Sequence, residues 1–211
     1  MIENIELVSS TQQEVLEVSN FENSELASTA EICEYINKNI PSEHLIGCPQ
    51  IEYNPEASVF VNECPEALGA YDTRSGEIFI NEHNSLEGSN GMLETITHEI
   101  GHNAHANLEK EAPHLAEHWS KMYRESLVKD FFVGDGFVSE YAKTSQYEDF
   151  AECYANYVRN PEALAFLCPE KYAFMDQYVF HQNSEMNLDF QVDGQLESLA
   201  SQDFRCFSIL A

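Results

Sequence analysis

Basic residues are scarce in this chain of 211 residues, which has 10 Lys and Arg against 37 Asp and Glu. The resulting formal net charge of −27 repels phosphate groups and anionic lipid. We therefore expect no nucleic-acid partner and no basic membrane-binding patch. The same acidity suits a basic protein or peptide as partner, although a charge that serves only solubility explains it equally well.

Long hydrophobic runs are also missing. No segment reaches the roughly 20 apolar residues that a transmembrane helix needs, so we expect no membrane span. Residues 1–23 contain neither Lys nor Arg and no long apolar core, and they therefore lack the pattern of a secretory signal.

Cysteine pairs at redox or metal-binding spacing are absent. No CxxC pair occurs, and in a chain without a signal the thiols are expected to be reduced. A nucleophilic cysteine with a neighbouring histidine has no local support either. The six cysteines are Cys33, Cys48, Cys64, Cys153, Cys168 and Cys206.

The chain does contain the sequence His98-Glu99-Ile100-Gly101-His102, an HExxH motif. On a helix, histidines at i and i+4 place both imidazoles on one face, where they can share one zinc ion. Leu93, Ile96, Ile100 and Ala104 form an apolar stripe roughly opposite to them. The pattern therefore predicts a helix, beginning near Ser89, that packs on its domain and presents two metal ligands and Glu99 to a cleft.

A catalytic zinc site needs a third protein ligand. The metzincin pattern would place Gly and His where this chain has His105 and Leu108, which excludes it. A second helix, ending near Asn160-Pro161, offers Glu148 and Glu152 on the face opposite an apolar stripe.

Two interpretations of Glu148 stay open. It can be the third zinc ligand, with Glu152 accepting the outer N–H of a ligating histidine. Alternatively, Ser145 and Glu148 can form a capping box at the start of the helix. Asp149 lies about a quarter turn from the two glutamates, and we expect it to be solvated.

HEIGH followed by Tyr141, Glu148 and Glu152, with Phe150-Ala151 before the last glutamate, resembles the catalytic domain of anthrax lethal factor and its relatives, including the Pro-Pro endopeptidases. The similarity covers roughly residues 78–158. It implies that His98, His102 and Glu148 bind Zn²⁺, that Glu99 is the general base, and that Tyr141 assists at the oxyanion or leaving group. In this family pattern Glu152 contacts a metal-binding histidine and does not bind the metal itself.

The function implied is a zinc-dependent endopeptidase that cleaves selected proteins, in a bacterial effector or toxin. Such a protein is made in the bacterial cytoplasm and exported or translocated into a host cell. The alternative is a non-catalytic interaction module that keeps a structural or vestigial zinc site. The sequence names neither the substrate, nor the export route, nor the oligomeric state.

The expected fold is α+β and zincin-like, with a small mixed sheet in the N-terminal half and a mainly helical C-terminal half. Residues 70–71 and 77–81 read as a hairpin, whose strand next to the histidine helix can pair with an extended peptide. Residues 59–61 are a further strand candidate. We expect an acidic N-terminal segment over residues 1–30, either flexible or a capping strand and helix, and one domain over residues 31–211 with a cleft near residues 92–152.

Other histidines give weaker signals. His114 and His118 are also spaced i and i+4, but no glutamate follows the first histidine, so a second metal site there stays an open question. His105 lies near the cleft face of its helix and could contact a substrate, but solvent exposure past the end of the helix is the simpler expectation.

Overall fold

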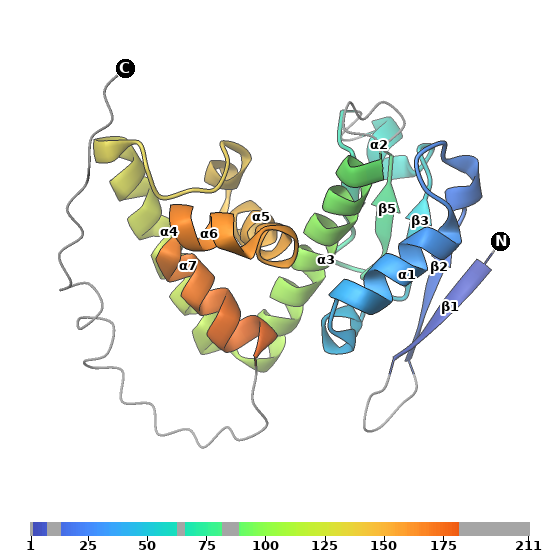
Figure 1. The fold of residues 1–211 in the computed structure, drawn as a ribbon, viewed down its shortest axis with the longest axis horizontal. Helices are drawn as coiled ribbons and strands as arrows, with labels where there is room; N and C mark the ends of the chain where they lie inside the picture. Colours follow the sequence, from blue (N-terminus) through green and yellow to red (C-terminus); the bar gives the residue numbers. More distant parts are fainter. Residues whose placement is uncertain (1, 8–13, 63–65, 82–88, 182–211) are drawn as a thin grey trace. The chain divides into compact units, whose positions relative to one another are not determined.

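The computed structural model describes residues 2–7, 14–62, 66–81 and 89–181, and within these residues the strands come first and the long helices follow (Figure 1). The fold is therefore α+β and mostly helical with a small mixed sheet, as the sequence predicts. Of the expected domain, residues 182–211 lie outside the described part of the chain.

The sheet has five strands in the order β1-β2-β3-β5-β4. The central pairs β2–β3 and β3–β5 are parallel, whereas β1 and β4 pair antiparallel to their neighbours at the two edges. The predicted hairpin is formed by β4 and β5, but β4 is its edge strand and β5 lies inside the sheet. The strands are β1 (Ile2–Leu7), β2 (Glu14–Ser19), β3 (Gln50–Tyr53), β4 (Gly69–Tyr71) and β5 (Ile78–Ile80).

Alternate residues of the inner strands are buried on one face of the sheet. Leu16 and Val18 in β2, and Ile78 and Ile80 in β5, are fully buried. Because side chains two residues apart in a strand point to the same face, this spacing builds a continuous apolar surface.

Two helices cover that surface, α1 (Thr29–Asn39) and α3 (Ser89–Glu111) (Figure 1). A capping box formed by Ser28 and Glu31 starts α1. The hydroxyl groups of Tyr35 in α1 and Thr97 in α3 are 2.7 Å apart, which places the two helices side by side.

The other side of α3 faces the helical half of the protein. Trp119 in α4 is fully buried and packs edge-on against Phe150 in α5 and Phe174 in α7. These helices are α4 (Pro113–Val133), α5 (Gln146–Arg159), α6 (Pro161–Leu167) and α7 (Pro169–Phe174). The shorter elements are η1 (Phe21–Asn23), η2 (Ser42–Leu45), α2 (Ser58–Asn62), η3 (Tyr141–Thr144) and the π-helical turn η4 (Met175–Phe180).

One expectation changes at the N-terminal side. The strand predicted over residues 59–61 is wrong, because Val59, Phe60 and Val61 belong to α2 and only Phe60 is buried. A run of three apolar residues is too short to reveal a helical or strand period. The described residues of the acidic segment over residues 1–30 include β1, β2, η1 and the start of α1, and β2 pairs with β3.

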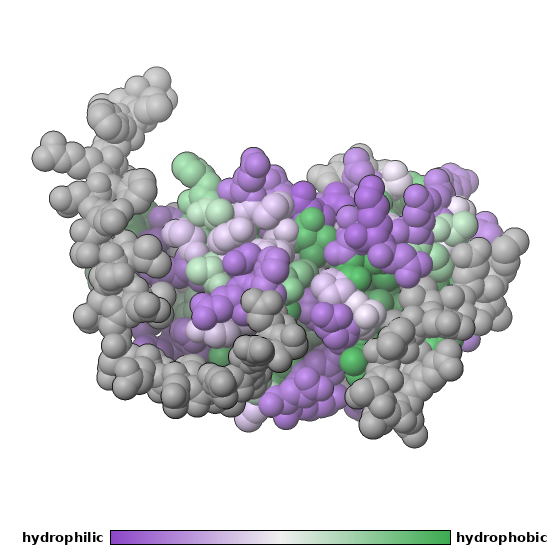
Figure 2. Space-filling model, turned by 60° about the horizontal axis from the view of Figure 1, so that its bottom comes forward, coloured by the Kyte–Doolittle hydropathy of each residue, from purple (hydrophilic) through white to green (hydrophobic). Residues whose placement is uncertain are grey.

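Hydrophilic side chains cover most of the described part of the face drawn in Figure 2, and hydrophobic ones form separate smaller patches. No helix among the described residues is both long and apolar enough to cross a lipid bilayer. Cys33, Cys48, Cys153 and Cys168 are free thiols in the buried interior, and Cys64 and Cys206 lie outside the described residues.

Candidate metal centre

The two histidines of the HExxH motif lie next to each other on the side of α3 that faces α5. Their rings are 4.9 Å apart between centroids and stand nearly perpendicular. Ile96 and Ile100 are fully buried in the core, as the stripe predicts. The histidine face is also largely covered, because His98 is only 8% exposed.

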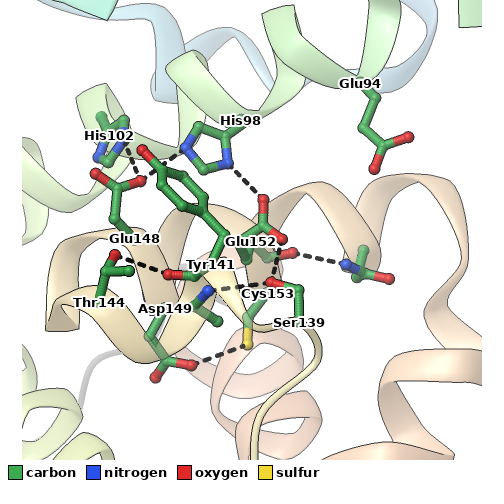
Figure 3. Close-up of polar contacts among 12 residues, drawn as sticks. Glu94, His98, His102, Ser139, Tyr141, Thr144, Glu148, Asp149, Glu152 and Cys153 are labelled. Carbon is green, nitrogen blue, oxygen red and sulfur yellow. Dashed lines mark hydrogen bonds and ion pairs between the residues drawn. The ribbon is translucent and has the colours of Figure 1, made fainter. Parts of the chain in front are cut away.

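Glu148 in the first turn of α5 approaches both histidines (Figure 3). Its Oε2 atom is 3.0 Å from Nε2 of His98 and 3.3 Å from Nε2 of His102. One ligand atom from each of the three residues lies within 4.8 Å of the others, and among the described residues this is the only such group of His, Cys, Asp or Glu. Two imidazole nitrogens with one carboxylate oxygen is a donor set that catalytic zinc sites use, so the residues fit a zinc ion.

Of the capping box predicted for Ser145 and Glu148, the structure shows the hydrogen bond to the Ser145 side chain but not the one to the Glu148 side chain. Ser145 caps α5, since its hydroxyl accepts a hydrogen bond from the backbone N–H of Glu148 at 3.1 Å. The Glu148 side chain does not turn back toward Ser145 but reaches the histidines. The cap therefore fixes the backbone at this point and leaves the carboxylate for the metal centre.

Gly101, the second variable residue of the motif, allows α5 to come this close to α3. A Cβ atom at Gly101 would lie 3.0 Å from Cα of Ala151 and 3.1 Å from Cβ of Tyr154. Such distances are shorter than ordinary van der Waals contact, so a larger residue would push the helices apart. The glycine thus brings the carboxylates of α5 within reach of the histidines.

Glu99 points from α3 toward the edge strand β4 and is 6% exposed. A Cβ atom at Gly69 would lie 2.6 Å from Oε1 of Glu99, so only glycine leaves room for this carboxylate. Burial raises the pKa of Glu99, while the charges of His102 and His98 and a backbone hydrogen bond from Tyr71 lower it to a smaller extent. These contacts place the carboxylate of Glu99 between the histidine pair and the edge of the sheet.

Tyr141 in η3 lies beside the histidines. Its ring centroid is 5.8 Å from that of His98, and its side chain reaches up toward the histidine pair in Figure 3. The residue is 54% exposed. Burial of the hydroxyl and the charge of Glu148 raise the pKa of Tyr141 to about 12, so at neutral pH it can donate a hydrogen bond.

Glu152 lies one turn further along α5, behind His98. Its Oε1 atom accepts a hydrogen bond from Nδ1 of His98 at 2.9 Å. Its Oε2 atom accepts a second one from the hydroxyl of Ser139 at 2.6 Å. Sequence reasoning did not single out Ser139, because it lies in an irregular loop where no helical spacing relates it to the site.

The charges of the site are strongly coupled. Burial alone lowers the pKa of His98, but hydrogen bonds with Glu148 and Glu152 outweigh it and raise the pKa to about 10. Burial favours a higher pKa for Glu148, yet hydrogen bonds with His102 and His98 hold it far below its usual range. A metal ion at this place therefore competes with a proton on His98, and its affinity is expected to rise with pH.

Asp149 is not solvated, and that expectation is wrong. The residue is fully buried, and its Oδ1 atom is 2.6 Å from Nζ of Lys171, a lysine that is itself 2% exposed. As its spacing predicts, Asp149 lies on a different face of α5 from Glu148 and Glu152. The spacing could not show that α7 contributes a buried cation on that side.

The expectation for His105 is also wrong. It is 2% exposed and lies edge-on to Tyr147 and Phe150, because α3 continues to Glu111 and α5 covers it. His118 packs against Phe174 and Tyr178. Neither His118 nor His114 joins a group that can hold a metal ion among the described residues.

His98, His102 and Glu148 thus form a group that could hold a metal ion. A family model described as "Putative zinc-binding metallo-peptidase" matches residues 11–166, which is most of the chain. The chain belongs to this family and is a metallopeptidase by that relationship. Among curated proteins, none matches the chain.

Proposed function

We propose that this protein is a zincin-like endopeptidase of the lethal-factor type, with zinc held by His98, His102 and Glu148. The observation that carries the proposal is the convergence of three ligand atoms within 4.8 Å from two helices. The family match supports zinc and peptidase chemistry independently of that geometry.

Glu99 and Tyr141 supply the reacting groups in this proposal. Zinc bound at such a centre lowers the pKa of water and polarises the carbonyl of the substrate. Glu99, buried next to both histidines, accepts the proton of the attacking water and passes it to the leaving amine. Tyr141 donates a hydrogen bond to the developing oxyanion.

Glu152 fixes the orientation of His98. Because it accepts the hydrogen bond from Nδ1, the Nε2 atom of the same ring is left for the metal ion. His98 is thereby kept in the tautomer that a metal ligand needs.

The substrate in this proposal is an extended segment of a protein. β4 is the last strand in the order of the sheet, and Gly69 in β4 lies against Glu99. A peptide that pairs with the outer edge of β4, where the backbone N–H of Tyr71 already bonds Glu99, would therefore run past the proposed base. The net charge of −27 favours basic segments. The setting in a bacterial effector or toxin rests on the resemblance to lethal factor alone.

The first experiment measures the metal content of the purified protein by elemental mass spectrometry. We expect one zinc ion per chain, and its loss in Glu148→Ala. Glu94→Ala is the control, because Glu94 lies on α3 with the two histidines, is paired with Arg159 at the surface, and points away from the histidines in Figure 3. A folded wild type that takes up no zinc would refute the proposed centre.

The second experiment measures cleavage of an unfolded protein or a peptide library. Glu99→Ala should keep its zinc and lose about 100- to 10,000-fold in kcat/KM, the usual contribution of a general base. Glu94→Ala should cleave like the wild type. Full activity of Glu99→Ala would exclude the assigned role of this residue. Zinc binding without any cleavage in the wild type would favour the alternative of a non-catalytic module.

A further inference from the structure

The loop between α4 and η3 carries a serine with two defined partners. The hydroxyl of Ser139 accepts a hydrogen bond from the backbone N–H of Ala142 at 3.0 Å. It donates its own proton to Oε2 of Glu152 at 2.6 Å (Figure 3). An ionised carboxylate can only accept hydrogen bonds, so the hydroxyl of Ser139 is the donor in its bond to Glu152.

This bond holds the second oxygen of a carboxylate whose first oxygen is already in use. Oε1 of Glu152 contacts Nδ1 of His98 at 2.9 Å, so Ser139, Glu152 and His98 form one chain of hydrogen bonds. A hydroxyl bond to a carboxylate at this distance is charge-assisted and belongs to the stronger kind. With both oxygens held, the carboxylate has little freedom to rotate, and the ring of His98 keeps one angle.

The loop that carries Ser139 is also held by Lys171 in α7. The ammonium group of Lys171 donates a hydrogen bond to the backbone oxygen of Gly136 at 2.8 Å while it also binds Asp149. Asp149 lies in the same helix as Glu152. The loop and the helix are thus tied together at a buried point, and the serine and the glutamate are presented to each other at a fixed separation.

We propose that Ser139 is a positioning residue of the metal centre, which acts on His98 through Glu152. This inference rests on the proposed function for its biological meaning, since a fixed ring angle at Nε2 matters only if His98 binds a metal ion. Its local role as a partner of Ala142 in the turn before Tyr141 is a separate, purely structural contribution. The two roles make different predictions when Glu152 is removed.

The experiment is a double-mutant cycle on zinc affinity with Ser139→Ala, Glu152→Ala and the double variant. Affinity is measured for zinc alone, in competition with a chromophoric chelator. We expect Ser139→Ala to bind zinc roughly tenfold more weakly, at the lower end of the range for outer partners of a ligand. In the Glu152→Ala background the same change should cause no further loss. Ser139→Thr keeps the hydroxyl and should restore most of the affinity.

Ser120→Ala is the control, because Ser120 is a buried serine that also accepts a hydrogen bond, from Arg124 at 2.6 Å, but lies in α4 away from Glu152. It should bind zinc like the wild type. Wild-type affinity in Ser139→Ala, or an equal loss with and without Glu152, would overturn the proposal.

A wild type that binds no zinc would refute the proposed function, and the same four proteins would still test the inference. Their free energies of unfolding in denaturant then give the coupling between the two residues in the metal-free protein. If the two substitutions change the free energy of unfolding non-additively, the proposal that Ser139 positions Glu152 is supported. If the two changes in the free energy of unfolding are additive, the proposal is overturned.

Discussion

At the scale of single residues, each side chain of the centre is fixed by a second contact. Glu148 starts from a capped helix turn, His98 is held by Glu152, and Glu99 lies under Gly69. Preorganised groups of this kind lose little freedom when they bind a ligand or stabilise a charge. Tyr141 is the most exposed of these side chains: it is half exposed, with its ring beside His98 and its hydroxyl hydrogen-bonded to Glu148.

Replacing Tyr141 by Phe tests its assigned role. The variant should keep its zinc and its KM, because the ring remains, but kcat should fall about 100- to 1000-fold through the loss of an oxyanion donor. Steady-state kinetics on a cleaved peptide gives both constants. Tyr147→Phe is the control, since Tyr147 is similarly exposed but lies against His105. An unchanged kcat in Tyr141→Phe would leave Tyr141 as a packing residue only.

At the scale of elements, the centre depends on the close approach of α3 and α5. The histidines and Glu99 come from one helix, and Glu148 and Glu152 come from the other, so their separation is decided by the contact at Gly101. The buried pair of Lys171 and Asp149 adds a tie between α5 and α7. Breaking a buried ion pair costs far more than a surface pair contributes.

Gly101→Val should therefore damage metal binding as well as stability. The added atoms meet Ala151 and Tyr154, and overpacking of this kind typically costs about 1–3 kcal/mol in the free energy of unfolding. Because α5 is pushed away from the histidines, zinc affinity should fall also. Chelator competition and denaturant unfolding measure the two effects.

The matched control is Ala106→Val, which places the same side chain on a half-buried position of the same helix. Wild-type zinc affinity in Gly101→Val would show that α5 can shift without moving Glu148.

At the scale of the whole molecule, stability depends on pH through buried histidines. Burial and, to a smaller extent, the charge of His102 lower the pKa of His105 to about 4, whereas the unfolded chain has the usual value of about 6.5. Burial lowers the pKa of His44 as well, although a hydrogen bond to Val179 opposes this. Below pH ~6.5 the unfolded state binds protons that the folded state does not, so the free energy of unfolding falls as the pH falls.

His105→Leu isolates this effect. Between pH 7 and pH 5 the wild type should lose about 2 kcal/mol of stability relative to the variant, because one pKa unit corresponds to about 1.4 kcal/mol. Denaturant unfolding of both proteins at the two pH values gives the difference. A constant difference between the two proteins would mean that His105 is protonated equally in the folded and unfolded states.

Sequence patterns predicted a helix that begins near Ser89, the helix that ends before Pro161, and the hairpin of β4 and β5, but not that the first helix continues to Glu111. It also named the three residues whose ligand atoms the structure brings together. These features depend on spacing along one element, and spacing is local information. The prediction of a strand over residues 59–61 was wrong, because three apolar residues are too few to show whether their spacing is that of a helix or of a strand.

The tertiary structure alone decided which groups from distant segments meet. Lys171 makes Asp149 a buried residue, α5 covers His105, and an irregular loop delivers Ser139 to Glu152. Whether the carboxylate of Glu148 turns toward its own helix start or toward the histidines was equally a matter of packing. The sequence by itself determined the chemistry available on each helix face. Which faces come together depends on long-range contacts such as the one at Gly101, whose energies no local pattern records.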